Sequence, residues 1–150
     1  MQYQSRASTS IYLNFSNQTE EAFNFYKSVF ATDFVGEITR LGDIPHQQGQ
    51  VELDEVTKKL IMHVQLPLLG GVMLHGTDDP ESTNFKVIQG NNFYIMLEPD
   101  TKYEADQLFS KLSEGGKVEM QMTDMFWGDY WGSFTDKFGL NWMINVVAKK

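Results

Sequence analysis

The chain has 150 residues, 41% of them hydrophobic and 13% aromatic, which is enough for one domain with a buried core and excludes wholesale disorder. The formal net charge is −8 and the basic residues come at most in pairs, which argues against a nucleic-acid partner. The absence of cysteine excludes disulfides, thiolate metal sites and cysteine nucleophiles.

The apolar segments are too short for a targeting or membrane role. Residues 1–10 lack the apolar run of a signal peptide. The longest apolar stretch, residues 66–69 with 72–74, is far below the ~20 residues of a membrane span. We therefore expect a soluble, cytoplasmic protein without a membrane partner.

The first half of the chain predicts one strand, one helix and three further strands. Residues 10–15 (SIYLNF) alternate in hydrophobicity, as a strand does. From Thr19 to Phe30 apolar side chains recur at helical spacing, and Glu20 and Glu21 suit the first turn of a helix. Three strands are expected next, at residues 34–41, 59–66 and 71–75, with a polar loop at 42–49.

The same order returns in the second half. Residues 92–98 predict a strand, and Thr101 and Glu104 have the spacing of a capping box at the start of a helix over residues 101–113. Gly115-Gly116 ends this helix. Three more strands are expected at residues 118–122, around 130–135 and at 141–147, and residues 77–90 are predicted to link the halves.

The two halves align at a constant offset. Glu21 corresponds to Glu104, a shift of 104 − 21 = 83 residues, and at the same shift Tyr26 meets Phe109. The strands before the helices keep this register, which two unrelated β-α units would not need to do. We therefore predict a single α+β domain of two tandem βαβββ modules, at about residues 8–76 and 91–147.

Two long motifs resemble those of a known family. They are YLNFSNQTEEAFNFYKSVF (residues 12–30) and FWGDYWGSFTDKFGLNWMIN (residues 126–145). The chain resembles PhnB-like proteins of the glyoxalase/bleomycin resistance/dioxygenase (vicinal oxygen chelate) superfamily over nearly all of residues 10–147. This resemblance implies βαβββ modules whose mixed sheet curls around a cavity, and a homodimer. It implies no single reaction, because the superfamily includes lyases, isomerases, dioxygenases and drug-sequestering proteins.

Proteins of this branch sometimes carry the label demethylubiquinone methyltransferase. The sequence offers no glycine-rich strand-to-helix turn for S-adenosylmethionine, since Gly70-Gly71 lies between two predicted strands. We therefore do not expect methyl transfer.

Metal-dependent members of the superfamily place one ligand on the first strand and one on the last strand of each module. By motif, these positions are Thr9, His75, Asn92 and Met143. Only His75 is a strong ligand for a divalent ion, whereas a stable site needs about three. We predict no bound metal or other cofactor, and a metal-dependent lyase, isomerase or dioxygenase is the alternative.

The segment MFWGDYWG (residues 125–132) is the densest aromatic feature, and it would be costly if exposed. Such side chains suit the wall of a small-molecule pocket, a packed core strand or a dimer contact. We predict a ligand site lined by Trp127, Tyr130, Trp131 and Trp142, with His75 and Asn92 as polar contacts. Strand alternation puts Trp142 on the face opposite Met143, so the core is its alternative place.

The remaining candidates favour structural roles. His63 is expected to make a core or inter-strand hydrogen bond, His46 to be exposed in a loop, and Asp136 to form a turn. Our leading hypothesis is a PhnB-like protein that binds a small organic ligand, with enzymatic activity left open. A drug-sequestering resistance protein is a further alternative.

Overall fold

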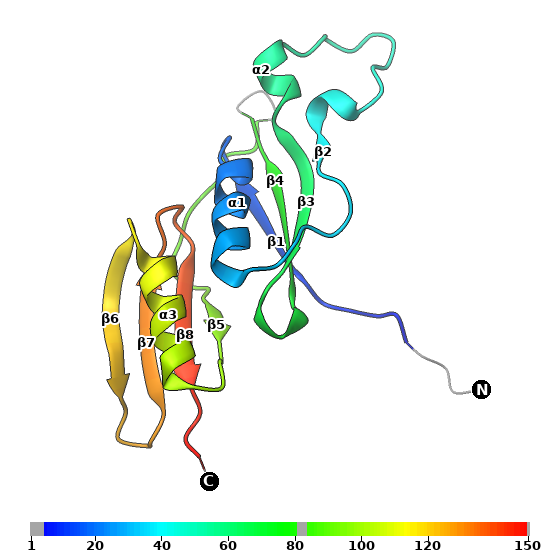
Figure 1. Ribbon diagram of the computed structural model, residues 1–150. Helices are drawn as coiled ribbons and strands as arrows, with labels where there is room; N and C mark the ends of the chain where they lie inside the picture. Colours follow the sequence, from blue (N-terminus) through cyan, green and yellow to red (C-terminus); the bar gives the residue numbers. More distant parts are fainter. Residues whose placement is uncertain (1–4, 81–83, 150) are drawn as a thin grey trace, which may run out of the picture. The chain divides into compact units, whose positions relative to one another are not determined.

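The computed structural model describes residues 5–80 and 84–149, and its elements follow the predicted order twice (Figure 1). The first module consists of β1 (Ile11–Phe15), α1 (Thr19–Phe30), β2 (Thr39–Arg40), β3 (Ile61–Pro67) and β4 (Met73–Asp78). The second consists of β5 (Ile95–Leu97), α3 (Lys102–Ser113), β6 (Lys117–Asp124), β7 (Tyr130–Thr135) and β8 (Asn141–Val146). Three short helical segments, η1 (Leu41–Asp43), α2 (Glu55–Lys58) and η2 (Leu69–Gly71), lie in connections of the first module. The prediction of tandem βαβββ modules is confirmed.

Each module builds its own open, mixed sheet of four strands. The strand orders are β1-β4-β3-β2 and β5-β8-β7-β6. β1 runs parallel to β4 and β5 parallel to β8, whereas the other neighbours are antiparallel. The same topology in both halves confirms the α+β class and the internal repeat.

The chain divides into two compact units that do not coincide with the modules. The first sheet forms one unit with residues up to Phe23 of α1, and the second sheet forms the other unit with residues 24–31. We call them unit 1 and unit 2. The helix α1 therefore supplies residues to both.

The core of unit 1 lies on one face of its sheet. Phe23 of α1 is buried against β4, where a Cβ at Gly76 would collide with the Phe23 ring. The buried carboxylate of Asp78 accepts hydrogen bonds from the backbone N–H of Thr19, at 3.0 Å, and of Ile61, at 2.8 Å. These bonds fix the start of α1 and the start of β3 to the end of β4.

The core of unit 2 is aromatic. Trp142 of β8 is fully buried, and its ring lies 5.8 Å from Tyr26 and 5.9 Å from Phe30. α3 packs on the sheet, with Phe109 edge-on to Phe134 of β7 at 4.9 Å. Large rings bury much apolar area for little loss of rotamer freedom, which suits them to a small core.

The helices match their predicted positions more closely than the strands do. α1 has the predicted bounds, and Thr101 caps α3 by accepting a hydrogen bond from the N–H of Glu104. The strand predicted at residues 34–41 shrinks to two residues, since the chain bends at Gly36, where φ is 70°. The remaining ladder with β3 shifts register between Thr39 and Arg40. β4 extends into the predicted linker, of which residues 81–83 lie outside the described part.

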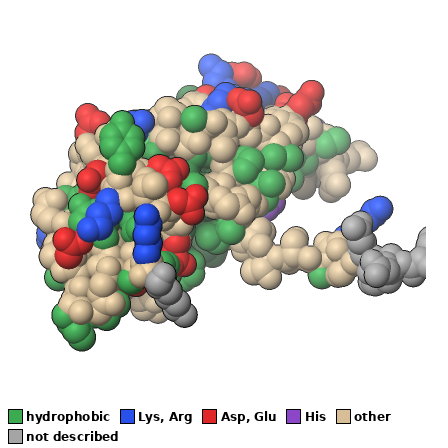
Figure 2. Space-filling view, turned by 60° about the horizontal axis from the view of Figure 1, so that its bottom comes forward, with side chains coloured by type: hydrophobic (Ala, Val, Ile, Leu, Met, Phe, Trp, Pro, Cys, Tyr) green, Lys and Arg blue, Asp and Glu red, His purple; other side chains and the backbone are tan. Residues whose placement is uncertain are grey.

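The surface carries charges of both signs. Figure 2 shows acidic and basic side chains interspersed on one face, with hydrophobic side chains between them. No helix in residues 5–80 and 84–149 has both the length and the hydropathy needed to cross a membrane.

Candidate functional site

The first sheet has a buried face and an open face. Along β4, Leu74, Gly76 and Asp78 are buried, whereas His75 between them is only half-buried. Strand pairing places Tyr12 of β1 on one side of His75 and Gln65 of β3 on the other. Because directly paired residues point to the same face, polar and aromatic side chains gather on the open face.

Three of these side chains form a cluster, which we call the imidazole cluster: Tyr12, His63 and His75. Nε2 of His63 lies 2.8 Å from Nδ1 of His75, a hydrogen-bond distance. The Tyr12 ring stacks parallel to the His75 ring, with an interplanar angle of 4° and centroids 5.8 Å apart. Tyr12 also lies 6.2 Å from the His63 ring. The inter-strand hydrogen bond predicted for His63 is present, with His75 as its partner.

The surroundings of the cluster favour neutral imidazole at His75. Partial burial, and then the charge that His63 acquires on protonation, lower the pKa of His75 below its ordinary value. A neutral imidazole has one N–H donor and one acceptor nitrogen. Near neutral pH, therefore, His75 can act as a hydrogen-bond partner or as a base.

The superfamily's divalent metal does not fit the residues present. The motif alignment assigned four positions, Thr9, His75, Asn92 and Met143. Thr9 and Asn92 are exposed and precede the strands β1 and β5. The strand residue that pairs with His75 is Tyr12, and the one that pairs with Met143 is Met96. In the described part of the chain, no group of three or more His, Cys, Asp or Glu side chains is placed to hold a metal ion. Since a stable site needs about three ligands, this donor set is too poor.

The aromatic segment forms the turn of the β6–β7 hairpin in unit 2. The backbone N–H of Met125 donates to the Asp129 carbonyl at 2.7 Å, and Gly128 takes a positive φ of 103° in the turn. Phe126 is 97% exposed and Trp127 is 55% exposed, and their rings meet edge to face at 4.9 Å. The tip of the hairpin is thus an aromatic surface rather than a buried wall.

The stem of this hairpin is better packed. Tyr130 and Trp131 are half-buried on β7. The Tyr130 hydroxyl donates to Asp106 of α3 at 2.7 Å, and this hydrogen bond, with lesser contributions from burial and from the charges of Asp106 and Asp124, raises the pKa of Tyr130 to about 12.

The six predicted site residues fall in different places. Trp127, Tyr130 and Trp131 all belong to the hairpin, but Tyr130 and Trp131 are neighbours on β7 and point to opposite faces of the sheet. Trp142 is in the core of unit 2, where its Nε1–H donates to Asp136 at 2.9 Å, and Asn92 is exposed before β5. His75 belongs to unit 1.

Sequence reasoning did not assign Tyr12 and His63 to a site. One signal was available in the predicted strands 59–66 and 71–75, which the Gly70-Gly71 turn joins as a hairpin. Folding this hairpin back on itself brings His63 and His75 close together.

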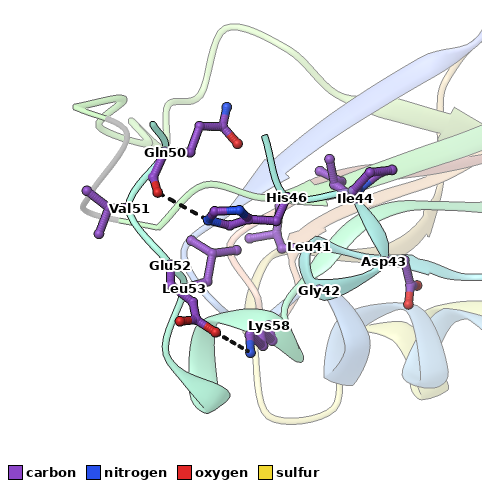
Figure 3. Close-up of a pocket in the computed structure, with 11 residues that line it drawn as sticks. Leu41, Gly42, Asp43, Ile44, His46, Gln50, Val51, Glu52, Leu53 and Lys58 are labelled. Carbon is purple, nitrogen blue, oxygen red and sulfur yellow. Dashed lines mark hydrogen bonds and ion pairs between the residues drawn. The ribbon is translucent and has the colours of Figure 1, made fainter. Parts of the chain in front are cut away.

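A cavity of about 730 Å³ lies in the connection between β2 and β3 (Figure 3). Apolar side chains, including Leu41 and Leu53, line it together with His46. The His46 ring is held by the Gln50 carbonyl at 3.1 Å, and Lys58 is paired with the nearby carboxylates of Glu52 and Glu55. These polar groups are engaged with one another. His46 is exposed, as predicted.

Comparison with known proteins gives a consistent picture. Residues 7–145 match the family model described as 3-demethylubiquinone-9 3-methyltransferase. Protein PA1353 from Pseudomonas aeruginosa is 31% identical, with a TM-score of 0.76 over 95% of this chain and 100% of that chain. A protein from Bacillus cereus described as a putative 3-demethylubiquinone-9 3-methyltransferase, PhnB protein, is 22% identical, with a TM-score of 0.73 over 94% and 100%. A glyoxalase/bleomycin resistance protein/dioxygenase family enzyme from Burkholderia phytofirmans is 17% identical, with a TM-score of 0.60 over 91% and 96%.

Proposed function

We propose that this chain, which belongs to the 3-demethylubiquinone-9 3-methyltransferase family, binds a small organic ligand on the open face of its first sheet. The family is a PhnB-like branch of the glyoxalase/bleomycin resistance superfamily. The observation that carries this proposal is the imidazole cluster, in which His63 and His75 are hydrogen-bonded and Tyr12 is stacked on His75.

The cluster has the composition of a small-molecule site. Such sites combine aromatic or apolar surface with a few polar groups whose positions are fixed. Tyr12 supplies the aromatic surface, and the hydrogen bond between the imidazoles fixes the orientation of both rings. Because the lowered pKa of His75 favours its neutral form, the same site has a base available for proton transfer.

We do not extend the methyltransferase description of the family to this chain. A nucleotide-like cofactor such as S-adenosylmethionine is commonly bound by a glycine-rich turn between a strand and a helix. The connections β1–α1 (residues 16–18) and β5–α3 (residues 98–101) contain no glycine. Gly70-Gly71 turns between the strands β3 and β4, as predicted.

We also propose a cellular location and an oligomeric state for the protein. A cytoplasmic protein that binds neither nucleic acid nor membrane is supported by the absence of cysteine and the net charge of −8. The proposed homodimer is supported by the family to which the chain belongs. Trp127, Tyr130 and Trp131 of the hairpin are proposed as further ligand contacts, with Tyr130 and Trp131 on opposite faces of β7.

A fragment screen by NMR on the ¹⁵N-labelled chain tests the site. We expect hits to perturb the amides of β1, β3 and β4, and to bind at least about tenfold more weakly to His63→Gln and His75→Gln, because one polar contact contributes about 1.4 kcal/mol. His46→Gln is the matched control, since His46 is an exposed histidine outside the cluster. Hits that bind all three variants like the parent would show that the cluster is structural.

A further inference from the structure

The hydrogen bond between His63 and His75 limits how the pair can hold protons. With Nε2 of His63 and Nδ1 of His75 facing each other at 2.8 Å, one proton must lie between them. In the neutral pair, one outward nitrogen then carries an N–H and the other carries a lone pair. The outward nitrogens are Nδ1 of His63 and Nε2 of His75.

One additional proton changes the outward chemistry and keeps the inner bond. An imidazolium donates to a neutral imidazole, so both outward nitrogens become N–H donors and the pair carries one positive charge. A second additional proton would set two N–H groups against each other at 2.8 Å and would break the bond. The charge of His63 also lowers the pKa of His75, which opposes double protonation. The geometry therefore favours one shared positive charge.

The four strands of the first sheet place no carboxylate on the face of the imidazole cluster. The strands β1, β2, β3 and β4 contain only two charged residues besides the histidines, Arg40 and Asp78. Asp78 is buried on the other face, where it accepts two backbone N–H groups. Arg40 of β2 donates to the Lys59 carbonyl and pairs with Glu20 of α1. The residue that β1 contributes to the cluster is Tyr12, whose side chain is a phenol and not a carboxylate.

We propose that the His63–His75 pair, holding one shared extra proton, binds a small organic carboxylate on the open face of the first sheet. The carboxylate accepts an outward N–H and neutralises the shared charge, and the exposed ring of Tyr12 covers an apolar part of the same ligand. This inference rests on the proposed function and names its ligand class. Because the bound anion stabilises the protonated pair, binding strengthens as the pH falls and weakens again once a second proton breaks the inner bond.

Benzoate is a suitable probe and benzamide is its neutral isostere. Both are titrated into the full chain at pH 8, 7 and 6 by calorimetry, with a chelator present so that no trace metal mediates binding. We expect benzoate affinity to rise by up to about tenfold per pH unit, as for one linked proton, and benzamide affinity to stay constant. The double variant that combines His63→Gln with His75→Gln leaves no imidazole in the cluster and is expected to lose the pH dependence, whereas His46→Gln keeps it.

A second readout needs no variant. In ¹⁵N NMR of the imidazoles of the parent protein, benzoate is expected to shift the titration of the His63–His75 pair to higher pH and to leave that of His46 unchanged. Equal pH dependence for benzoate and benzamide, or unchanged imidazole titration, overturns the anion proposal even if the variants fail to fold. If neutral ligands still require His63 and His75, the proposed function is kept and only the carboxylate as ligand class is rejected. If no ligand requires these two residues, the proposed function and the carboxylate inference are both rejected.

Discussion

Asp136 is the buried carboxylate of unit 2, and it accepts four hydrogen bonds. They come from the hydroxyl of Tyr26 at 2.6 Å, Nε1–H of Trp142 at 2.9 Å and the backbone N–H groups of Phe138, at 2.8 Å, and Leu140, at 3.0 Å. In Asp136→Asn an amide NH₂ would face some of these donors, so we expect the free energy of unfolding to fall by about 3 kcal/mol in urea titrations. A loss below about 1 kcal/mol would contradict this account.

Tyr26→Phe removes one of the four donors to Asp136 and is expected to lower the free energy of unfolding by less than Asp136→Asn does. Its effect on stability also depends on pH. Burial first, then the charge of Asp136 and the hydrogen bond to it, raises the pKa of Tyr26 well above 10.0. Because the folded-state pKa exceeds the unfolded one, this group's contribution to stability is complete below pH 10 and is lost as the pH rises further. Urea titrations from pH 8 to 11 should therefore show a smaller decline in stability for the variant than for the parent.

At the scale of elements, α3 depends on its N-cap. The Thr101 hydroxyl accepts the N–H of Glu104 at 3.1 Å and satisfies one of the free amides of the first turn. Thr101→Ala is expected to lower the free energy of unfolding by about 1 kcal/mol, and Thr101→Ser, which keeps the hydroxyl, to lower it by much less. Equal effects of the two substitutions would show that the cap is not the cause.

The β6–β7 hairpin gives the second prediction at this scale. Trp127 is more than half exposed and Trp131 is half-buried, so Trp127→Ala is expected to leave the thermal midpoint nearly unchanged and Trp131→Ala to lower it. If the hairpin contacts the ligand, both variants weaken binding while Trp127→Phe retains most of it, as read by quenching of tryptophan fluorescence. Folded variants that bind like the parent would make the hairpin a structural element only.

For the whole molecule, we predict one cooperative domain that assembles as a homodimer. The helix α1 supplies residues to both units, so far-UV circular dichroism and the fluorescence of the tryptophans in unit 2 should report the same transition.

Large apolar side chains such as Phe93 and Met96 are at least half exposed in the single chain, and burial in a dimer would remove them from water. Sedimentation at micromolar concentration that shows only a 17.2 kDa species would refute the dimer.

The sequence alone determined the features that depend on neighbours along the chain. The spacing of Ala22, Tyr26 and Val29 located α1, and Thr101 with Glu104 located the start of α3, because helical periodicity and caps are local signals. The constant offset between the halves predicted the βαβββ repeat, and the PhnB-like motifs indicated the family.

Tertiary structure decided which distant residues meet. The parallel pairing of β1 with β4 puts Tyr12 against His75, and the β3–β4 hairpin adds His63, so that three separate sequence positions become one cluster. Burial was decided in the same way, since Trp142 became a core residue only when Tyr26 and Asp136 packed around it. Strand register and side-chain burial depend on long-range packing, and a one-residue change in the register of β4 or β8 would turn His75 or Trp142 to the opposite face of its sheet.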